Sequence, residues 1–220
     1  MCLQVPLFFL QGGKAVKKIR LCAVLCALSL MLCAMCVSCA KKDAKGDGGT
    51  KKPDVFALEL SEYIELGEYK NLIIIFTYES RSEAAWREVI NGSEVIKYPE
   101  ELVSYYTEQT KARYSYYAEK NDMEYSKVLE DFGATEESIA TEAKALAKAD
   151  LVFAALVKAE SITLSDSEKS EHFGRYLEFY VESYGYTEEY VKENLTDEIY
   201  ESMLYDKASE FLIINNSFPE

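Results

Sequence analysis

Apolar and polar residues repeat with the period of an α-helix over most of this chain. From Pro99 onward, apolar and tyrosine side chains recur every three or four residues to about residue 121, which predicts a helix with one buried face. The proline and the two glutamates that follow it are typical of a first helical turn. A short helix should come next and stop near Gly133, and a long one should cover about 135–160.

The last third of the chain carries clear signals for helix starts and ends. Ser165 and Glu168 have the spacing of a capping box, in which each side chain bonds to the backbone of the other residue. Gly185 is placed to close the helix that they open. Two further helices are expected over 187–195 and 197–215. The sequence therefore predicts an all-α domain of long helices joined by short turns.

Residues 72–78 (Leu-Ile-Ile-Ile-Phe-Thr-Tyr) are the exception to this helical pattern. A run of β-branched and aromatic residues is typical of a strand. A lone strand would leave backbone polar groups without partners, and residues 94–98 are the nearby candidate to pair with it. We therefore expect a short β element at the N-terminal side of the helical domain.

A leader precedes the helical domain. Residues 14–20 are basic without an acid, and residues 21–38 are uncharged and mostly apolar, which is the pattern of a secretory signal peptide. Cys-Val-Ser-Cys at 36–39 is similar to a bacterial lipobox, so we expect cleavage between Ser38 and Cys39, and lipidation of Cys39 with diacylglycerol and palmitate. The alternative is an uncleaved membrane-spanning helix, because the apolar stretch is close to the shortest spanning length. Either way, the domain is expected at the extracytoplasmic face of a bacterial cell membrane.

These features divide the sequence into three parts. Residues 1–38 form the signal peptide. Residues 39–54 are rich in lysine and glycine and hold no large apolar side chain, so we expect a flexible tether. Residues 55–220 are long enough for one helical domain with its own core. All six cysteines lie in the first 39 residues, so this domain has no disulfide and no thiolate metal site.

Composition excludes several classes of function. The chain has 38 acidic and 24 basic residues and a net charge of −14, and the leader contributes only basic ones. Nucleic-acid binding is excluded, because affinity for phosphates depends on lysine and arginine. His172 is the single histidine, and neither a hydrolase motif nor a phosphate-binding glycine loop accompanies it. We therefore expect no catalytic residue, no metal and no cofactor.

Tyrosine is the most unusual residue in the composition. The chain has 17 tyrosines, all after the leader. In a thin helical domain such rings bridge core and water, but a ring with a polar tip also suits adaptable contacts with polypeptide. The candidate polypeptide-binding residues are Tyr106, Tyr114, Tyr117, Phe153, Tyr176 and Tyr180.

Four phrases, in order along the domain, resemble the trigger factor family. Leu66-Gly-Glu-Tyr-Lys-Asn-Leu72 is similar to the phrase before the family's isomerase domain, and Tyr98-Pro-Glu-Glu-Leu102 to the start of its helical C-terminal region. Ala118–Met123 fits the turn that follows, and Leu204-Tyr-Asp-Lys207 fits the last helix. The resemblance implies an elongated multi-helix domain, SurA-like or trigger-factor C-terminal-like, whose arms hold unfolded chains without reading their sequence.

Two parts of that family have no expected counterpart here. The phrase of its ribosome-docking loop (Gly-Phe-Arg-x-Gly-Lys) is absent from the sequence. Tyr78 and Val95 are too close in the sequence to hold the isomerase domain that the family places between them. The resemblance therefore implies the helical chaperone part without the prolyl isomerase pocket.

Three functions follow from these observations as hypotheses. The first is a lipid-tethered chaperone, a holdase or folding helper, that binds unfolded or nascent exported polypeptides. The second is a scaffold lipoprotein that binds one folded partner through its helical surface. The third is a prolyl isomerase, as in full-length family members, and the missing domain argues against it.

Overall fold

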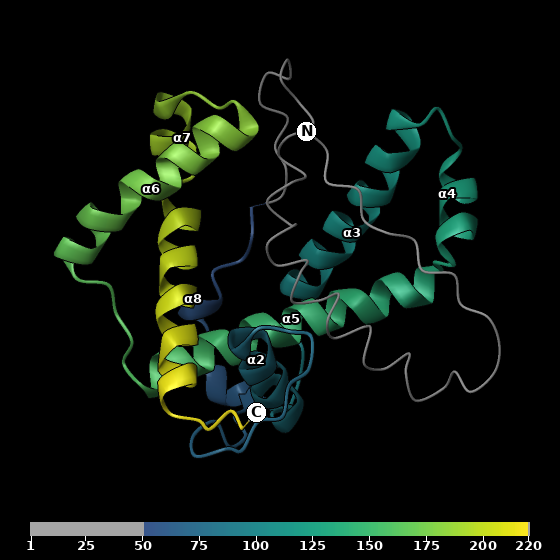
Figure 1. Cartoon of the computed structure of the whole chain (residues 1–220). Helices are drawn as coiled ribbons and strands as arrows, with labels where there is room; N and C mark the ends of the chain where they lie inside the picture. The colour runs from purple at the N-terminus through teal and green to yellow at the C-terminus, as the bar shows by residue number, and fades with distance from the viewer. Residues whose placement is uncertain (1–50, 220) are drawn as a thin grey trace.

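A central helix, α5 (Glu136–Ala159), connects all parts of the computed structural model, which describes residues 51–219 (Figure 1). Ser38, Cys39 and most of the expected tether lie outside the described residues. Thr135 caps α5 through a capping box, and its first turn is acidic, which suits the positive end of the helix dipole. The half of α5 after Leu146 is buried on nearly every side.

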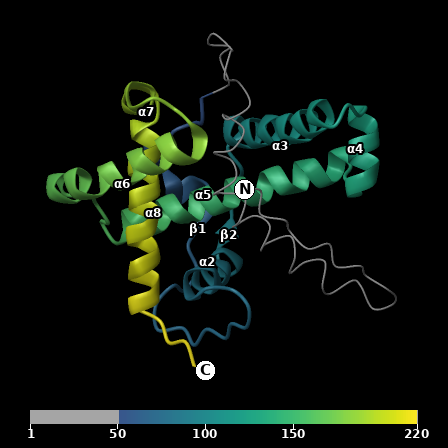
Figure 2. The ribbon, with the colours of Figure 1, turned by 45° about the horizontal axis from the view of Figure 1, so that its top comes forward.

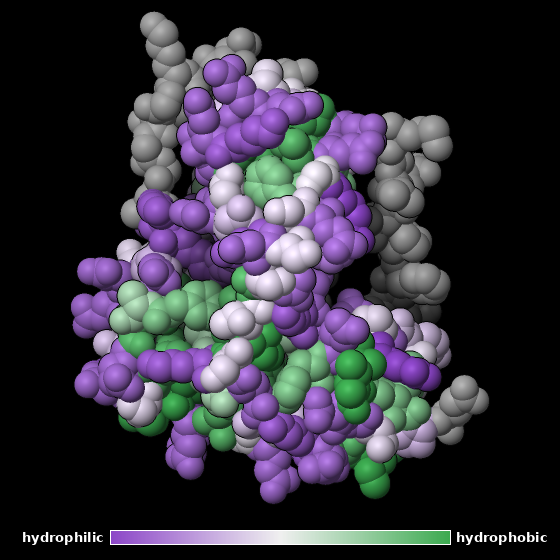
Figure 3. Space-filling model, turned by 90° about the vertical axis from the view of Figure 1, so that its left-hand side faces the viewer, coloured by the Kyte–Doolittle hydropathy of each residue, from purple (hydrophilic) through white to green (hydrophobic). Residues whose placement is uncertain are grey.

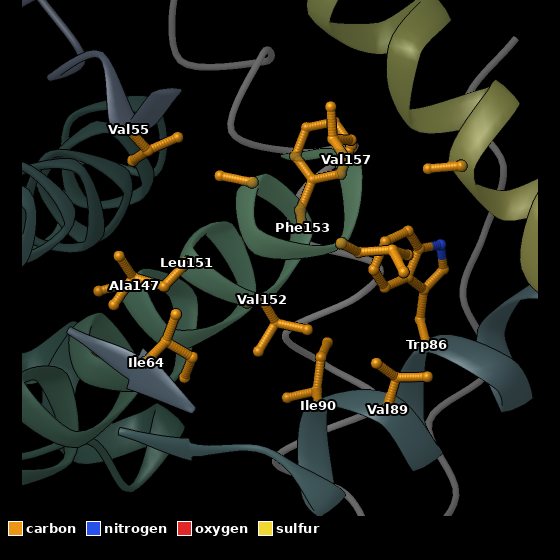
Figure 4. Close-up of a cluster of buried hydrophobic side chains, with 14 of the residues drawn as sticks. Val55, Ile64, Trp86, Val89, Ile90, Ala147, Leu151, Val152, Phe153 and Val157 are labelled. Carbon is orange, nitrogen blue, oxygen red and sulfur yellow. The ribbon is translucent and has the colours of Figure 1, made fainter. Parts of the chain in front are cut away.

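The body of the molecule forms where α2 (Arg81–Gly92) and α8 (Thr196–Ile214) pack against this buried half of α5 (Figure 4). The Trp86 ring stacks on Tyr205, with 5.0 Å between centroids, and its centroid lies 6.0 Å from that of Phe153 in an edge-on contact. Trp86 Nε1 donates a 2.8 Å hydrogen bond to Ser209 Oγ, so the polar atom of this large core ring is satisfied. Burying each such side chain contributes about 1.5–3 kcal/mol.

Two arms extend from the body to opposite sides (Figure 2). The first arm consists of α3 (Glu100–Lys120), α4 (Tyr125–Phe132) and the N-terminal half of α5. Helix α3 packs along α5 through Leu102 and its neighbours. Helix α4 ends at Gly133, which has φ of 63°, a left-handed conformation that glycine adopts without strain.

The second arm consists of α6 (Asp166–Tyr184), α7 (Glu188–Asn194) and the first half of α8. It has a small core of its own, formed by Tyr180, Val191, Ile199 and Met203. The expected capping box opens α6, and Gly185 closes it with φ of 69°. The helices from α3 to α8 thus confirm the expected all-α fold, with bounds within a few residues of those read from the sequence.

The expected strand at residues 72–78 is wrong. The β element consists instead of β1 (Ile64–Glu65) paired antiparallel with β2 (Glu94–Val95), beside two single turns at Val55–Ala57 and Leu60–Glu62. In the 72–78 segment only Ile73 makes a bridge, a parallel one to Ser217. The chain end supplies the backbone partners here, as in the 2.8 Å bond from the Ile74 amide to the Ser217 carbonyl, so no second strand forms.

Helix α2 was not expected from the sequence. Its start nevertheless carries a signal: Ser80 and Glu83 form a capping box in which the Ser80 amide donates to Glu83 at 2.7 Å and the Glu83 amide to Ser80 at 3.2 Å. The helix fills the stretch between the 72–78 segment and β2, and six of its residues are buried. It is therefore part of the body core and not a loop.

Candidate functional site

Three of the six aromatic residues selected from the sequence lie inside the molecule. Tyr106, Phe153 and Tyr180 are at most 4% exposed. The first two belong to the body core and the third to the second-arm core. The sequence selects them by their place on apolar stripes, and apolar stripes are the faces that helices turn toward each other. The structure therefore does not bring these three residues to a surface that a partner can reach.

Tyr176 is half-buried and links α6 to α8. Its hydroxyl donates a hydrogen bond to Asp206, and burial followed by this bond raises the pKa of the phenol. The hydroxyl is therefore committed to holding the base of the second arm.

The two remaining candidates gather at the end of the first arm. Phe132, at the end of α4, meets the ring of Tyr117 with 5.0 Å between centroids and that of Tyr114 with 6.0 Å. Tyr117 is 43% exposed and Phe132 57% exposed. We call these three residues the first-arm aromatic cluster. It offers an exposed apolar surface whose rings already stabilise one another.

A second cluster lies on the other arm. Phe179 and Tyr184 on α6 have centroids 5.5 Å apart, and Tyr186 stacks on Tyr190 of α7 at 4.9 Å. Phe179 and Tyr190 are both exposed. We call these four residues the second-arm aromatic cluster. Each arm thus presents its own group of aromatic rings, and each group comes from a different part of the sequence.

The sequence analysis missed Phe132, Phe179 and Tyr190. Phe179 lies on α6 outside the apolar stripe formed by Phe173, Tyr176, Leu177 and Tyr180. An apolar ring outside the buried stripe of an amphipathic helix is a signal for exposure. Tyr186 lies in the turn between α6 and α7 and stacks on Tyr190 of α7, a contact that helical spacing does not predict.

A third apolar surface lies at the base of the body. Ile73, Ile75, Tyr78 and Ile214 are exposed, Tyr78 completely, and the bridge from Ile73 to Ser217 holds their two segments together. We call these four residues the basal apolar strip. Figure 3 shows apolar residues gathered in the lower part of one face, the end where Figure 1 places α2 and the C-terminus.

An ion pair with a buried carboxylate lies at the base of both arms. Lys52 Nζ is 3.1 Å from Asp150 Oδ2 on α5 and 2.5 Å from Glu201 Oε1 on α8. Tyr106 of α3 donates a hydrogen bond to the same Asp150 oxygen. We call Asp150, Glu201 and Tyr106 together the junction notch, which the Lys52 ammonium occupies. One ammonium therefore joins the body half of α5 to the second-arm half of α8, beside the Tyr106 hydroxyl of the first arm.

The charges of the junction notch depend on one another. Burial is the largest influence on Asp150 and holds its pKa above the ordinary value, although Lys52 and the Tyr106 hydroxyl act in the opposite direction. Burial alone would lower the pKa of Lys52, but Asp150 and Glu201 outweigh burial and hold this pKa above its ordinary value. The sequence assigned Lys52 to the flexible tether, whereas its side chain is fixed against the body.

Residues 51–219 offer neither a metal centre nor a membrane-spanning helix. No group of histidine, cysteine, aspartate and glutamate side chains in this part of the chain has the arrangement of a metal site. None of the described helices is both long and apolar enough to cross a bilayer. The surfaces that stand out are the two aromatic clusters, the basal apolar strip and the junction notch.

Comparison with known proteins places this arrangement in a family. No curated protein and no solved structure matches the chain. The family model described as the C-terminus of the bacterial trigger factor protein matches residues 77–214, well over half of the chain and all helices from α2 to α8. The match includes three of the four phrases, while the one at 66–72 lies outside it. The resemblance to the family's C-terminal region is thereby confirmed, and the chain belongs to the trigger factor C-terminal family.

Proposed function

We propose that this protein is a chaperone that holds unfolded or nascent exported polypeptides between its two arms, at the extracytoplasmic face of a bacterial membrane. The observation that carries the proposal is the pair of aromatic clusters, one on each arm and both partly exposed. Membership of the trigger factor C-terminal family supports a chaperone-like function.

The arrangement suits many different clients. Any apolar side chain that covers an exposed aromatic ring stabilises the complex, by about 25 cal/mol per Å² of apolar surface buried. Two weak sites on one chain act together, because binding at one arm raises the effective concentration of the client at the other. Each single contact remains weak, so clients can leave. The net charge of −14 keeps copies of the chaperone apart.

The tether is proposed from the sequence of residues 14–39. A lipid on Cys39 would be joined to Lys51 by residues 40–50, which span at most roughly 40 Å when fully extended. Lys52 is held at the junction of the arms, so such a lipid keeps the arms close to the membrane from which exported chains emerge.

The proposed activity is binding without catalysis. The matched family region is the C-terminal one and contains no isomerase domain. The scaffold hypothesis remains the second candidate, and the basal apolar strip favours it, because a compact exposed apolar surface suits one folded partner.

Light scattering tests the proposal. The full chain in detergent micelles is mixed with a chemically unfolded client, and aggregation is followed after dilution of the denaturant. We expect suppression at a near-equimolar ratio with several unrelated clients. Unchanged scattering with all of them would overturn the proposal. A pull-down that yields a single stoichiometric folded partner would favour the scaffold, and accelerated proline-limited refolding would favour an isomerase.

A further inference from the structure

Residues 51–53, the first residues that the structure describes, lie at the junction of the arms. Lys51 and Pro53 line a hollow whose other wall is the start of α3, with Tyr105 and the glutamates 100, 101 and 108. Lys52, between them in the sequence, reaches into the junction notch. A basic segment thus lies over an acidic surface. Opposite charges face each other in the same way across the interface between a protein and a bound partner.

Lys52 is the main anchor of this segment. Among the described residues, no backbone hydrogen bond joins residues 51–53 to a helix, whereas the Lys52 ammonium binds two carboxylates. The side chains of Lys52 and Glu201 are 27% and 32% exposed, so the notch is open to solvent on this side. The chain stays anchored at Val55, which is buried in the body core, so the Lys52 side chain can leave the notch without unfolding the helices.

Asp150 determines what can replace Lys52. Asp150 is 0% exposed, and its Oδ1 has no hydrogen-bond partner within the described part of the chain. Removing the partner of a buried charge is strongly destabilising. When Lys52 leaves, Asp150 must either take up a proton, since burial raises its pKa, or bind another cation. A compact ammonium on a flexible stem fits a notch that already holds one.

We propose that the junction notch binds lysine side chains of unfolded polypeptides, and that Lys52 occupies it in cis until a client lysine exchanges with it. The inference rests on the proposed chaperone function and adds a preference to it. The aromatic clusters accept any apolar segment, whereas the notch selects segments that also carry a lysine. Exchange also releases the base of the tether, so client binding is coupled to the freedom of the arms relative to the membrane.

Amine labelling followed by mass spectrometry tests the exchange in the full chain. With excess acetylating reagent, Lys52 should react at least about tenfold more slowly than the exposed Lys120, because its ammonium is paired and its pKa is raised. A saturating unfolded client should speed the labelling of Lys52 several-fold. The same client with its lysines acetylated beforehand should not. Equal protection of Lys52 with both clients would overturn the proposal.

Three variants test the same exchange by affinity. Lys52→Gln removes the competitor, so the lysine-bearing client should bind several-fold more tightly. Lys97→Gln removes the same charge from an exposed pair with Glu62 and should change nothing. In the triple variant Lys52→Gln/Asp150→Asn/Glu201→Gln the notch is neutral, and the intact and acetylated clients should bind equally. The emission of the buried Trp86 reports whether each variant is folded. A gain in Lys52→Gln that is equal for both clients would contradict the exchange.

The notch and the chaperone function can fail separately. If no unfolded client binds at all, the proposed function is wrong, and a short Lys-Lys-Pro peptide then tests the notch alone. Faster labelling of Lys52 in the presence of this peptide shows that the notch takes lysine. Unchanged labelling shows that Lys52 is a fixed structural contact, and the inference is wrong as well.

Discussion

Tyr106 and Asp150 form a buried hydrogen bond between the first arm and the central helix. The Tyr106 hydroxyl donates to Asp150 Oδ2, and both side chains are almost completely buried. The bond lies beside the ion pair of Lys52, so α3 is fixed against α5 at the place where the tether enters. The same contact that stabilises the arm therefore shapes the junction notch.

Tyr106→Phe tests the energetic role of this bond. The substitution keeps the ring in the core but takes one donor from a buried carboxylate, and bonds to charged groups contribute about 1.5–3 kcal/mol. We expect the free energy of unfolding to fall by that amount in urea denaturation. Tyr105→Phe is the matched control, because Tyr105 is adjacent and less deeply buried, and it should cost less than about 0.5 kcal/mol. Equal losses of unfolding free energy in the two variants would show that the hydrogen bond to Asp150 does not contribute the expected stability.

The start of the second arm should be sensitive to acid. Lys207 donates to Glu168 at 2.5 Å, and this bond, together with the bond from Ser165, lowers the pKa of Glu168 from 4.5 to about 2. Because the folded pKa is the lower one, the folded state gains stability from Glu168 above pH 4.5 and loses it as the pH falls toward 2.

Hydrogen exchange of α6 amides at several pH values between 5 and 2 measures this loss. Protection should fall across this range in the natural chain. In Glu168→Gln the lost capping charge should reduce protection at pH 5 and flatten the pH dependence. A pH profile identical in both proteins would contradict the assigned role of Glu168.

Gly67 is required by a close backbone approach. A Cβ at this position would lie 2.3 Å from the carbonyl oxygen of Gly92 at the end of α2, so the 64–72 segment would have to move away from the body. We expect Gly67→Ala to lower the free energy of unfolding by about 1–3 kcal/mol. Gly174→Ala is the control, since a Cβ there meets no atom within 4 Å and Gly174 lies inside α6. It should stabilise the chain by about 0.5–1 kcal/mol. Thermal unfolding distinguishes the opposite signs.

The first-arm aromatic cluster should contribute to client affinity and little to stability. Replacing Tyr117 and Phe132 by serine removes two exposed rings, and we expect affinity for an unfolded client to fall roughly five- to tenfold, which is about 1–1.4 kcal/mol. The double variant Ile73→Ser/Ile75→Ser removes a similar exposed apolar area from the basal apolar strip. Fluorescence anisotropy of a labelled client should show little change for it. A larger loss from the basal variant would move the binding surface to the body.

The helices were predictable because their signals are local. Capping pairs such as Ser165 with Glu168, and glycines such as Gly133, specify where a helix starts or ends through contacts a few residues apart. The 72–78 segment was misread because strand formation depends on a partner far away in the sequence. The chain end supplied a bridge partner at Ser217 alone. A high β propensity does not produce a strand without a neighbouring strand to pair with.

The candidate site was less predictable than the fold. Periodicity selects rings on an apolar stripe, and this favours buried residues such as Phe153 over exposed ones such as Phe132. The junction notch gave no signal at all, because Lys52 lies in a stretch with the composition of a linker and its partner Glu201 is 149 residues away. Only the packing of three helices brings these charges together.

Photo-crosslinking tests most directly whether clients lie between the arms. A benzophenone amino acid is placed at Phe132, at Phe179 or at Tyr78 in the full chain, one position at a time, and irradiated with an unfolded client. All three side chains are exposed, so reactivity depends on where the client binds. We expect strong crosslinks from Phe132 on the first arm and Phe179 on the second, and weak ones from Tyr78 on the basal apolar strip. Crosslinks from Tyr78 alone would contradict binding between the arms.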